Sequence, residues 1–163
     1  MAFISISITK NHPLILGKGG FGRQLADWLS AEGWGEAEFL DDSAPGCVGG
    51  LRDYADPKLL KPGRPAFVAL GDNPLRVELL QKLAAAGYNT PVFISDMAAV
   101  SPSAVLEPGC VILPQAYVGA DAHLGVGCTI NGGAIVDHDA VLGRGVHVAP
   151  GGIVKAGAEV EAL

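Results

Sequence analysis

From residue 94 onward the chain carries an aliphatic residue at every sixth position, without a gap. The series is Ile94, Val100, Leu106, Ile112, Val118, Leu124, Ile130, Val136, Leu142, Val148, Val154 and Val160. Four positions after each of these, from Val100 onward, stands a small or short residue: Ala104, Cys110, Ala116, Ala122, Cys128, Ala134, Ala140, Val146, Gly152 and Ala158. A period of six matches neither the 3.6-residue period of a helix nor the two-residue period of a single strand.

This period predicts a solenoid of very short strands, with one hexapeptide on each side of a triangular coil. Eighteen residues then form one coil, and residues eighteen apart stack at the spacing of neighbouring strands, about 4.8 Å. The aliphatic residue points inward and the small residue lets the chain turn a tight corner. Because so narrow a prism has no internal pocket, ligands have to bind outside it, in grooves between neighbouring subunits. The alternative is a purely structural solenoid.

The first ninety residues have a different pattern, which predicts a β-α-β-β-α-β order. Short apolar runs predict strands at 14–16, 37–40, 66–70 and 91–94, and amphipathic spacing predicts helices at 23–31 and from Pro74 to a stop at Gly87. Proline in the first helical turn and glycine just past the helix end are typical of helix termini. Alternating strands and helices predict a truncated Rossmann-like sheet.

A glycine fingerprint, Gly17-x-Gly19-x-x-Gly22, joins the first strand to the first helix. Glycines let the backbone approach a phosphate, and the helix N-terminus offers N–H donors and a positive dipole. Asp41 and Asp42 follow the second strand, where a ribose-binding carboxylate is expected. A domain of half the usual size suits a mononucleotide better than a dinucleotide. The alternative is a tight strand-to-helix turn that binds no ligand.

Composition narrows the function classes. A net charge of −6 without a Lys/Arg cluster argues against a nucleic-acid partner. Residues 1–9 alternate apolar and polar positions but lack the basic start and the apolar run of a signal peptide, and no stretch is long enough to span a membrane. We expect a cytoplasmic protein, in which Cys110 and Cys128, stacked on adjacent coils, remain thiols.

The motifs in combination resemble those of the NeuD-like sugar acetyltransferases, a family of hexapeptide-repeat enzymes. The resemblance spans residues 12–163. It is carried by the glycine turn with Arg23, by Phe39-Leu-Asp-Asp42, Ala69-Leu-Gly-Asp-Asn73 and Ser101-Pro-Ser-Ala-Val105, and by Asn131 and Asp137-His-Asp139. The family includes sialic acid O-acetyltransferases and enzymes that N-acetylate a UDP-linked 4-amino-4,6-dideoxy sugar.

The resemblance implies the handedness, the domains and the site. It implies a Rossmann-like nucleotide-sugar domain at 1–94 and a left-handed parallel β-helix at 95–163. The residues implied to contact the nucleotide-sugar are Gly19, Gly20, Phe21, Asp41, Asp42 and Gly71. The resemblance further implies that His138 is the general base, that Asp139 raises its basicity, and that His147 contacts acetyl-CoA with Asn131 close by.

The residue chemistry is consistent with these roles. Attack of an amine on a thioester needs a base, and imidazole has a suitable pKa, about 6.5. His138 lies off the inward register and is expected to face outward, beside Ala156 of the next coil, whose N–H is a candidate oxyanion donor. His123, His138 and His147 lie at different phases of the coil, so the sequence predicts no metal site.

The resemblance therefore implies an acetyl-CoA-dependent N-acetyltransferase of a UDP-linked amino sugar, serving surface glycan biosynthesis. A homotrimer is expected, because an outward histidine needs a second subunit to form a groove. The alternatives are a sialic acid O-acetyltransferase and a catalytically weakened nucleotide-sugar-binding or scaffolding protein. The family runs some forty residues further, so the β-helix is expected to be short at its C-terminus, as a natural short form or a truncated one.

Overall fold

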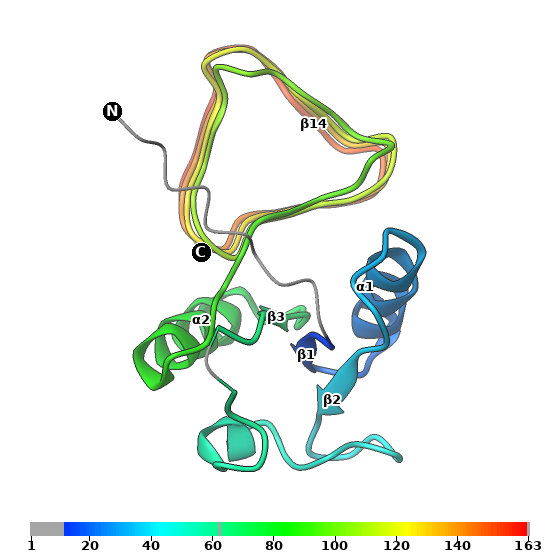
Figure 1. Cartoon of the computed structure of the whole chain (residues 1–163). Coiled ribbons are helices and arrows are strands. Elements are labelled where there is room, and N and C mark those ends of the chain that lie inside the picture. Colours follow the sequence, from blue (N-terminus) through cyan, green and yellow to red (C-terminus); the bar gives the residue numbers. More distant parts are fainter. Residues whose placement is uncertain (1–11, 62, 163) are drawn as a thin grey trace, which may run out of the picture.

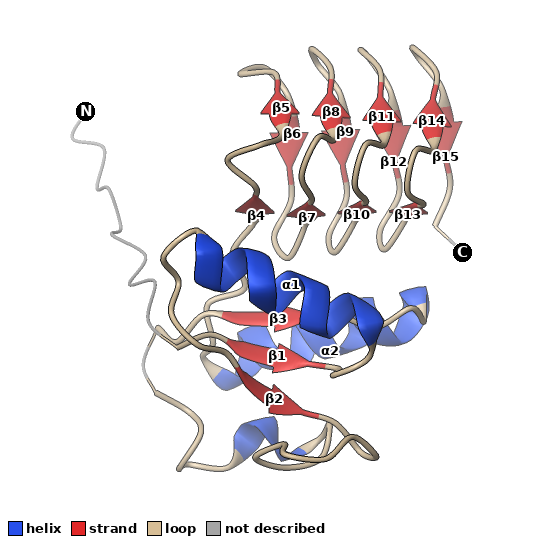
Figure 2. Cartoon of the chain, turned by 90° about the vertical axis from the view of Figure 1, so that its right-hand side faces the viewer, coloured by secondary structure: helices blue, strands red, loops and turns tan. Residues whose placement is uncertain are grey.

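The structure, a computed structural model, describes residues 12–61 and 63–162. It consists of an α/β part and a parallel β-solenoid of the left-handed β-helix type, which lies along the α/β part (Figures 1 and 2). Three sheets of four strands each form the sides of a triangle, so the solenoid has about four turns. The predicted fold class is confirmed.

The α/β part holds a three-stranded parallel sheet in the order β2-β1-β3. Its elements are β1 (Leu14–Leu16), α1 (Gly20–Ala31), β2 (Glu38–Leu40), the short 3-10 helix η1 (Asp53–Ala55), β3 (Ala66–Val68) and α2 (Asn73–Ala86). Helix α2 ends as predicted, at Gly87 in the left-handed conformation, and Asp72 caps its start by accepting the N–H of Leu75. Helix α1 begins at Gly20, three residues before the predicted start at Arg23. The sequence does not indicate the earlier start, because the first turn contains glycines, which have low helix propensity.

The strand predicted at 91–94 does not belong to the α/β sheet. β4 (Phe93–Ile94) pairs in parallel with β7 (Val111–Ile112), and the N–H of Phe93 donates to the carbonyl of Cys110. The physical reason is the six-residue register itself, which already includes Ile94 and therefore stacks this strand on the next coil. The sheet of the α/β part consequently has one strand fewer than predicted. The division into domains at residue 94 stays a prediction.

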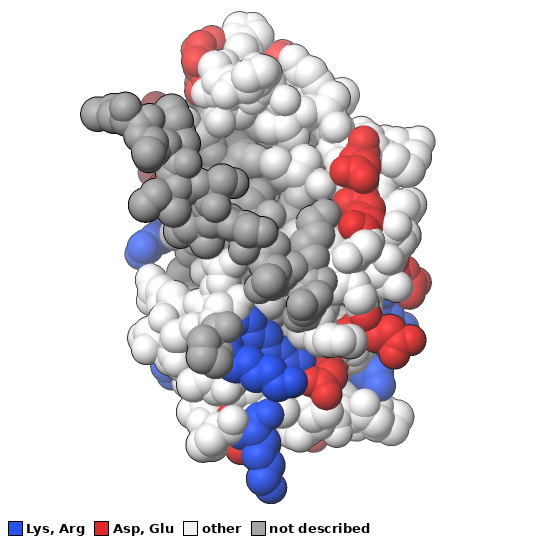
Figure 3. All heavy atoms as spheres, viewed as in Figure 1, with Lys and Arg blue, Asp and Glu red and all other residues white. Residues whose placement is uncertain are grey.

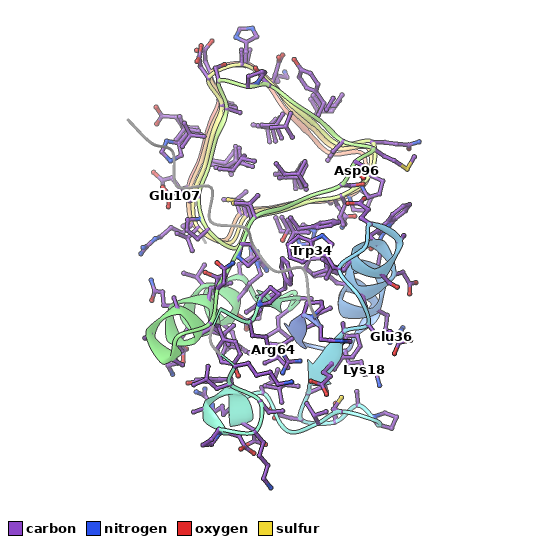
Figure 4. All side chains as sticks on the ribbon, viewed as in Figure 1. Lys18, Trp34, Glu36, Arg64, Asp96 and Glu107 are labelled. Atoms are coloured by element: carbon purple, nitrogen blue, oxygen red, sulfur yellow. The ribbon has the colours of Figure 1, made fainter. Side chains whose placement is uncertain are left out.

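The solenoid strands are two residues each. After β4 they are β5 (Ala99–Val100), β6 (Val105–Leu106), β7 (Val111–Ile112), β8 (Tyr117–Val118), β9 (His123–Leu124), β10 (Thr129–Ile130), β11 (Ile135–Val136), β12 (Val141–Leu142), β13 (His147–Val148), β14 (Ile153–Val154) and β15 (Glu159–Val160). The inward aliphatic residues of the middle coils fill the triangle and are fully buried, as Figure 4 shows. Ile94 is 41% exposed, because a neighbouring coil covers it on one side only.

One side of the solenoid, the base sheet (β4, β7, β10 and β13), faces the α/β part. Its outward residues Phe93 and Val111 are buried in one cluster with side chains of the α/β part. Trp34 lies between the two parts (Figure 4), with its ring centroid 5.5 Å from that of Phe67 and 6.4 Å from that of Phe93. This apolar contact fixes which side of the triangle the α/β part covers.

The three corners of the triangle have different neighbours. The α2 corner (107–110, 125–128 and 143–146) packs against helix α2, and the α1 corner (95–98, 113–116, 131–134 and 149–152) lies beside helix α1 (Figure 1). The apex corner (101–104, 119–122, 137–140 and 155–158) lies on the far side from the α/β part. Cys110 and Cys128 are free, buried thiols at the α2 corner, and each donates to a backbone carbonyl.

Candidate active site

The residues predicted to bind the nucleotide-sugar gather at one edge of the α/β sheet. Gly19, Gly20 and Phe21 follow β1, Asp41 and Asp42 follow β2, and Gly71 follows β3. Because the three strands are parallel and adjacent, their carboxyl ends meet at the same edge, the usual position of ligands in open α/β sheets.

The glycines of the fingerprint fall into two kinds. Gly17 has φ +100°, and a Cβ there would lie 2.7 Å from the carbonyl oxygen of Ala69. A Cβ on Gly22 would lie 1.9 Å from the carbonyl oxygen of Gly17. Close packing inside the turn therefore requires glycine at both positions. Gly19 and Gly20 have no described atom within 4 Å of an added Cβ. The turn therefore exposes bare backbone at the N-terminus of α1.

Asp41 ties two loops of this edge together. Its carboxylate accepts the N–H of Lys18 (2.8 Å) and the N–H groups of Ser43 and Ala44 (2.9 Å each). These bonds lower its pKa to about 2, the Lys18 N–H having the largest effect. Asp42 accepts the N–H of Leu51 (2.8 Å). Both carboxylates thus shape the loops that would surround a ligand, whatever contact they make with it.

His147, Asn131 and Phe21 form a second group, where the base sheet meets the start of α1. The ring centroids of Phe21 and His147 are 6.2 Å apart. Asn131 Oδ1 accepts the N–H of Gly132, which turns its Nδ2 toward Nε2 of His147 at 3.3 Å. Since Nδ2 only donates, Nε2 is the acceptor, and the proton of the neutral ring is on Nδ1. Burial, assisted by the nearby Arg76, lowers the pKa of His147 and favours this neutral ring.

His138 and Asp139 lie elsewhere, on the apex corner between β11 and β12. Nδ1 of His138 is 2.6 Å from Oδ2 of Asp139, and the two side chains are 59% and 63% exposed. The hydrogen bond to Asp139, followed by the charge of Asp137, raises the pKa of His138. With Nδ1 bound by a carboxylate, Nε2 is the ring nitrogen left to face a substrate.

The backbone around His138 is tightly stacked. A Cβ on Gly119, one coil earlier, would lie 2.5 Å from the backbone nitrogen of His138. One coil later, Gly157 donates its N–H to the carbonyl of His138 (3.0 Å), which places Ala156 beside His138 as the eighteen-residue period predicts. Ala156 is exposed. Its N–H as an oxyanion donor stays a prediction.

The structure thus brings Phe21, His147 and Asn131 together. His138 and Asp139 contact each other but lie away from that group. The base sheet and the apex corner are on opposite sides of the triangle (Figure 1). Within one chain, the predicted general base therefore faces away from the predicted substrate-binding edge. The sequence did not indicate this separation, because the period gives the position of a residue around the coil but not which side the α/β part covers.

A second exposed histidine of the solenoid also has a carboxylate partner. His123 Nε2 is 2.9 Å from Glu107 Oε1. Within 12–61 and 63–162, no three His, Cys, Asp or Glu side chains are placed to hold a metal ion.

No helix of those ranges is long and apolar enough to cross a membrane. On the face in Figure 3, Lys and Arg lie mostly over the α/β part.

One polar residue that was not predicted from the sequence is prominent in the structure. Arg76 is 1% exposed and lies on the apolar face of α2. Its spacing was a signal, because Leu79, Leu80 and Leu83 follow it at the intervals of one helix face.

Comparison with known proteins places these features in a family. Residues 14–83 match the family model described as the PglD N-terminal domain. The acetyltransferase domain of PglB from Neisseria gonorrhoeae FA1090, solved with acetyl coenzyme A, is 30% identical with a TM-score of 0.82, over 94% of this chain and 86% of that chain. PerB from Caulobacter crescentus, solved with CoA and GDP-perosamine, is 32% identical with a TM-score of 0.75, over 85% of this chain and 69% of that chain.

A more distant structure, WeeI from Acinetobacter baumannii AYE, shares the fold at 17% identity and a TM-score of 0.62, over 93% of this chain and 89% of that chain. No curated protein matches the chain. The α/β edge, the hexapeptide solenoid and the identity to PglB and PerB lead to one conclusion: the chain belongs to the hexapeptide-repeat, β-helical family of sugar acetyltransferases.

Proposed function

We propose that this acetyltransferase transfers the acetyl group of acetyl-CoA to the amine of a UDP-linked amino sugar in the cytoplasm. The observation that carries the proposal is the His138–Asp139 pair on the exposed apex corner, an exposed imidazole whose Nδ1 is held by a carboxylate and whose pKa is raised. Relatives support the class of reaction: PerB is described as a GDP-perosamine N-acetyltransferase, and PglB was solved with acetyl coenzyme A. Three free cysteines are consistent with a reducing compartment.

The residues have separate tasks in this proposal. The loops after β1, β2 and β3 hold the nucleotide-sugar, with Gly19, Gly20, Phe21 and Gly71 nearest to it and Asp41 and Asp42 shaping the loops. His147 and Asn131 receive the acetyl-CoA. His138 removes the proton from the amine as nitrogen attacks the thioester carbonyl, and the N–H of Ala156 stabilises the oxyanion.

We further propose that a homotrimer completes the site. The sheet β5-β8-β11-β14 joins the apex corner, which holds His138, to the α1 corner, which holds Asn131. Its outward column Tyr117, Ile135 and Ile153 is 43%, 37% and 67% exposed, an apolar stripe typical of an interaction surface. A copy packed on this side would bring the His138 of one chain to the His147 group of another, and three-fold symmetry makes three such sites.

An acetyl-transfer assay tests the reaction and its substrate. We expect acetylation of a UDP-linked 4-amino-4,6-dideoxy sugar, read by mass spectrometry, with the GDP-linked amino sugar and sialic acid as competitors. Faster turnover of the GDP-linked sugar would overturn the choice of nucleotide, and acetylation of sialic acid hydroxyls alone would overturn N-transfer. Binding of the nucleotide-sugar without acetyl-CoA binding or turnover would favour a binding protein.

The pH dependence of the reaction reports on His138. Its pKa is raised by Asp139, so half of the imidazole is neutral only at a pH above its ordinary pKa of about 6.5, and kcat is expected to rise with pH through a midpoint above that value. Asp139→Asn removes the largest cause of the shift and is expected to lower this midpoint, with a smaller loss of kcat than removing His138 itself. An unmoved midpoint in Asp139→Asn would show that another group sets the profile.

A further inference from the structure

Arg76, in the first turn of α2, joins the two parts of the molecule through four hydrogen bonds. In its own part, Nη1 donates to the carbonyl of Leu70 (2.6 Å) and Nη2 to Oδ1 of Asn73 (2.8 Å). In the solenoid, Nε donates to the carbonyl of Gly127 (2.9 Å) and Nη2 to that of Gly145 (2.5 Å). One planar group therefore bridges the loop after β3 and two successive coils.

This arrangement is costly, which suggests that it has a purpose beyond filling space. A buried charge is normally paired with an opposite charge, because removal from water is expensive. Among the described residues, none of the ion pairs includes Arg76; its four acceptors are neutral, and burial lowers its pKa. A leucine or methionine would fill the same volume without that cost. A guanidinium adds a rigid fork of donors that fixes direction.

The packing beside Arg76 shows how closely the two parts approach. Gly109, Gly127 and Gly145 are eighteen apart and stack at the α2 corner. A Cβ on Gly109 or Gly127 would lie 2.7 Å from Leu80, and one on Gly145 would lie 3.1 Å from the carbonyl oxygen of Asn73. The glycine stack lets α2 come near enough for Arg76 to reach the solenoid carbonyls.

The groups that Arg76 holds are those next to the proposed ligands. Leu70 and Asn73 flank Gly71, which is proposed to contact the nucleotide-sugar. Gly145 is two residues before His147, which is proposed to contact acetyl-CoA. At the α1 corner, Glu32 also accepts hydrogen bonds from the hydroxyl of Ser95 and the N–H of Asp96. The remaining contacts between the two parts are mainly apolar side chains, which resist separation but allow small sliding movements.

We propose that Arg76 is a positioning residue for acetyl transfer: it fixes the substrate loop 70–73 relative to the His147 strand, and so sets the alignment of the two ligands. The catalytic consequence rests on the proposed function, whereas the bridge itself does not. Misplacement of reacting groups by about 1 Å is enough to lower a rate by roughly 10²-fold.

The kinetic test compares Arg76→Met, which keeps an extended side chain but no donors, and Arg76→Lys, which keeps the charge, with Arg52→Met. Arg52 is a matched control, since it contacts Glu78 of the same helix but is 66% exposed. We expect Arg76→Met to lower kcat by roughly 10²-fold at a temperature where it is folded, with the Kd of each ligand alone within about threefold. Arg76→Lys is expected to recover part of kcat, and Arg52→Met to match wild type. A fall in Tm with kcat unchanged in both Arg76 variants would overturn the proposal and leave Arg76 a stabilising residue only.

Hydrogen exchange tests the bridge independently of activity. Amides of 70–73 and 145–147 are expected to exchange faster in Arg76→Met, or in Arg76→Lys if the methionine variant does not fold, while those of β1 remain as protected as in wild type. Equal exchange in all these segments would overturn the bridge even if wild type is active. Faster exchange with an inactive wild type would support the bridge and count against the proposed function alone.

Discussion

Replacing His138 by alanine is expected to lower kcat for acetyl transfer by roughly 10²–10⁴-fold, the usual contribution of a general base. The imidazole is exposed on the apex corner and its ring contacts Asp139 rather than the core, so its removal leaves no cavity. We therefore expect Tm and the Kd values of both ligands to stay close to wild type. Steady-state kinetics with the nucleotide-sugar, together with thermal unfolding, measures both expectations.

His123→Ala is the matched control for this loss. His123, like His138, is an exposed solenoid histidine paired with a carboxylate, that of Glu107. It lies away from the apex corner, in strand β9. Activity close to wild type is expected. If His138→Ala retained activity within a few fold of wild type, His138 would not be the base.

The largest expected effect on stability comes from the inward column of the solenoid. Ile112 is fully buried, and Ile112→Ala is expected to lower the free energy of unfolding by about 2–5 kcal/mol, through lost burial and the cavity left behind. Ile94 pairs with Ile112 in the same column but is 41% exposed, so Ile94→Ala is expected to cost about 1 kcal/mol.

Urea unfolding followed by circular dichroism, at one protein concentration, compares the two variants. The comparison is sharp because residue type, sheet and inward direction are the same and only the number of neighbouring coils differs. Equal losses of unfolding free energy in the two variants would contradict the position of β4 at the end of the solenoid, where only one neighbouring coil covers Ile94.

The solenoid was predictable residue by residue because its fold depends on a local pattern. Each inward position from Ile112 to Leu142 recurs with the period of six, and the corner residues Ala116 and Ala134 are buried where the small-residue series puts them. Helix α2 was equally predictable, since Pro74 and Gly87 act through local backbone chemistry. The strand at 93–94 was assigned to the wrong sheet, because its apolar run was taken as the last strand of the α/β part although Ile94 already stands in the six-residue register of the solenoid.

The site was harder to predict than the fold. The resemblance implies roles for His138 and His147, but it does not show that the two face opposite sides of one chain. That fact depends on Phe93 and Val111 burying the base sheet against the α/β part, a long-range contact. Arg76 was not predicted because a charged side chain is ordinarily expected on the solvent face of a helix, although its spacing from Leu79, Leu80 and Leu83 places it on the buried face.

In the proposed homotrimer the base of one copy acts on the substrate held by another, and a mixing experiment tests this arrangement most directly. Chains carrying His138→Ala, expected to lack the base, and His147→Ala, expected to lose the acetyl-CoA contact, are co-expressed with different tags and the mixed assemblies are purified. Each proposed site takes His138 from one chain and His147 from its neighbour, so one of the three sites in every mixed trimer has both histidines. About a third of wild-type activity is therefore expected in the purified mixed trimers. Activity no higher than that of the separate variants, in assemblies shown to contain both chains, would contradict it.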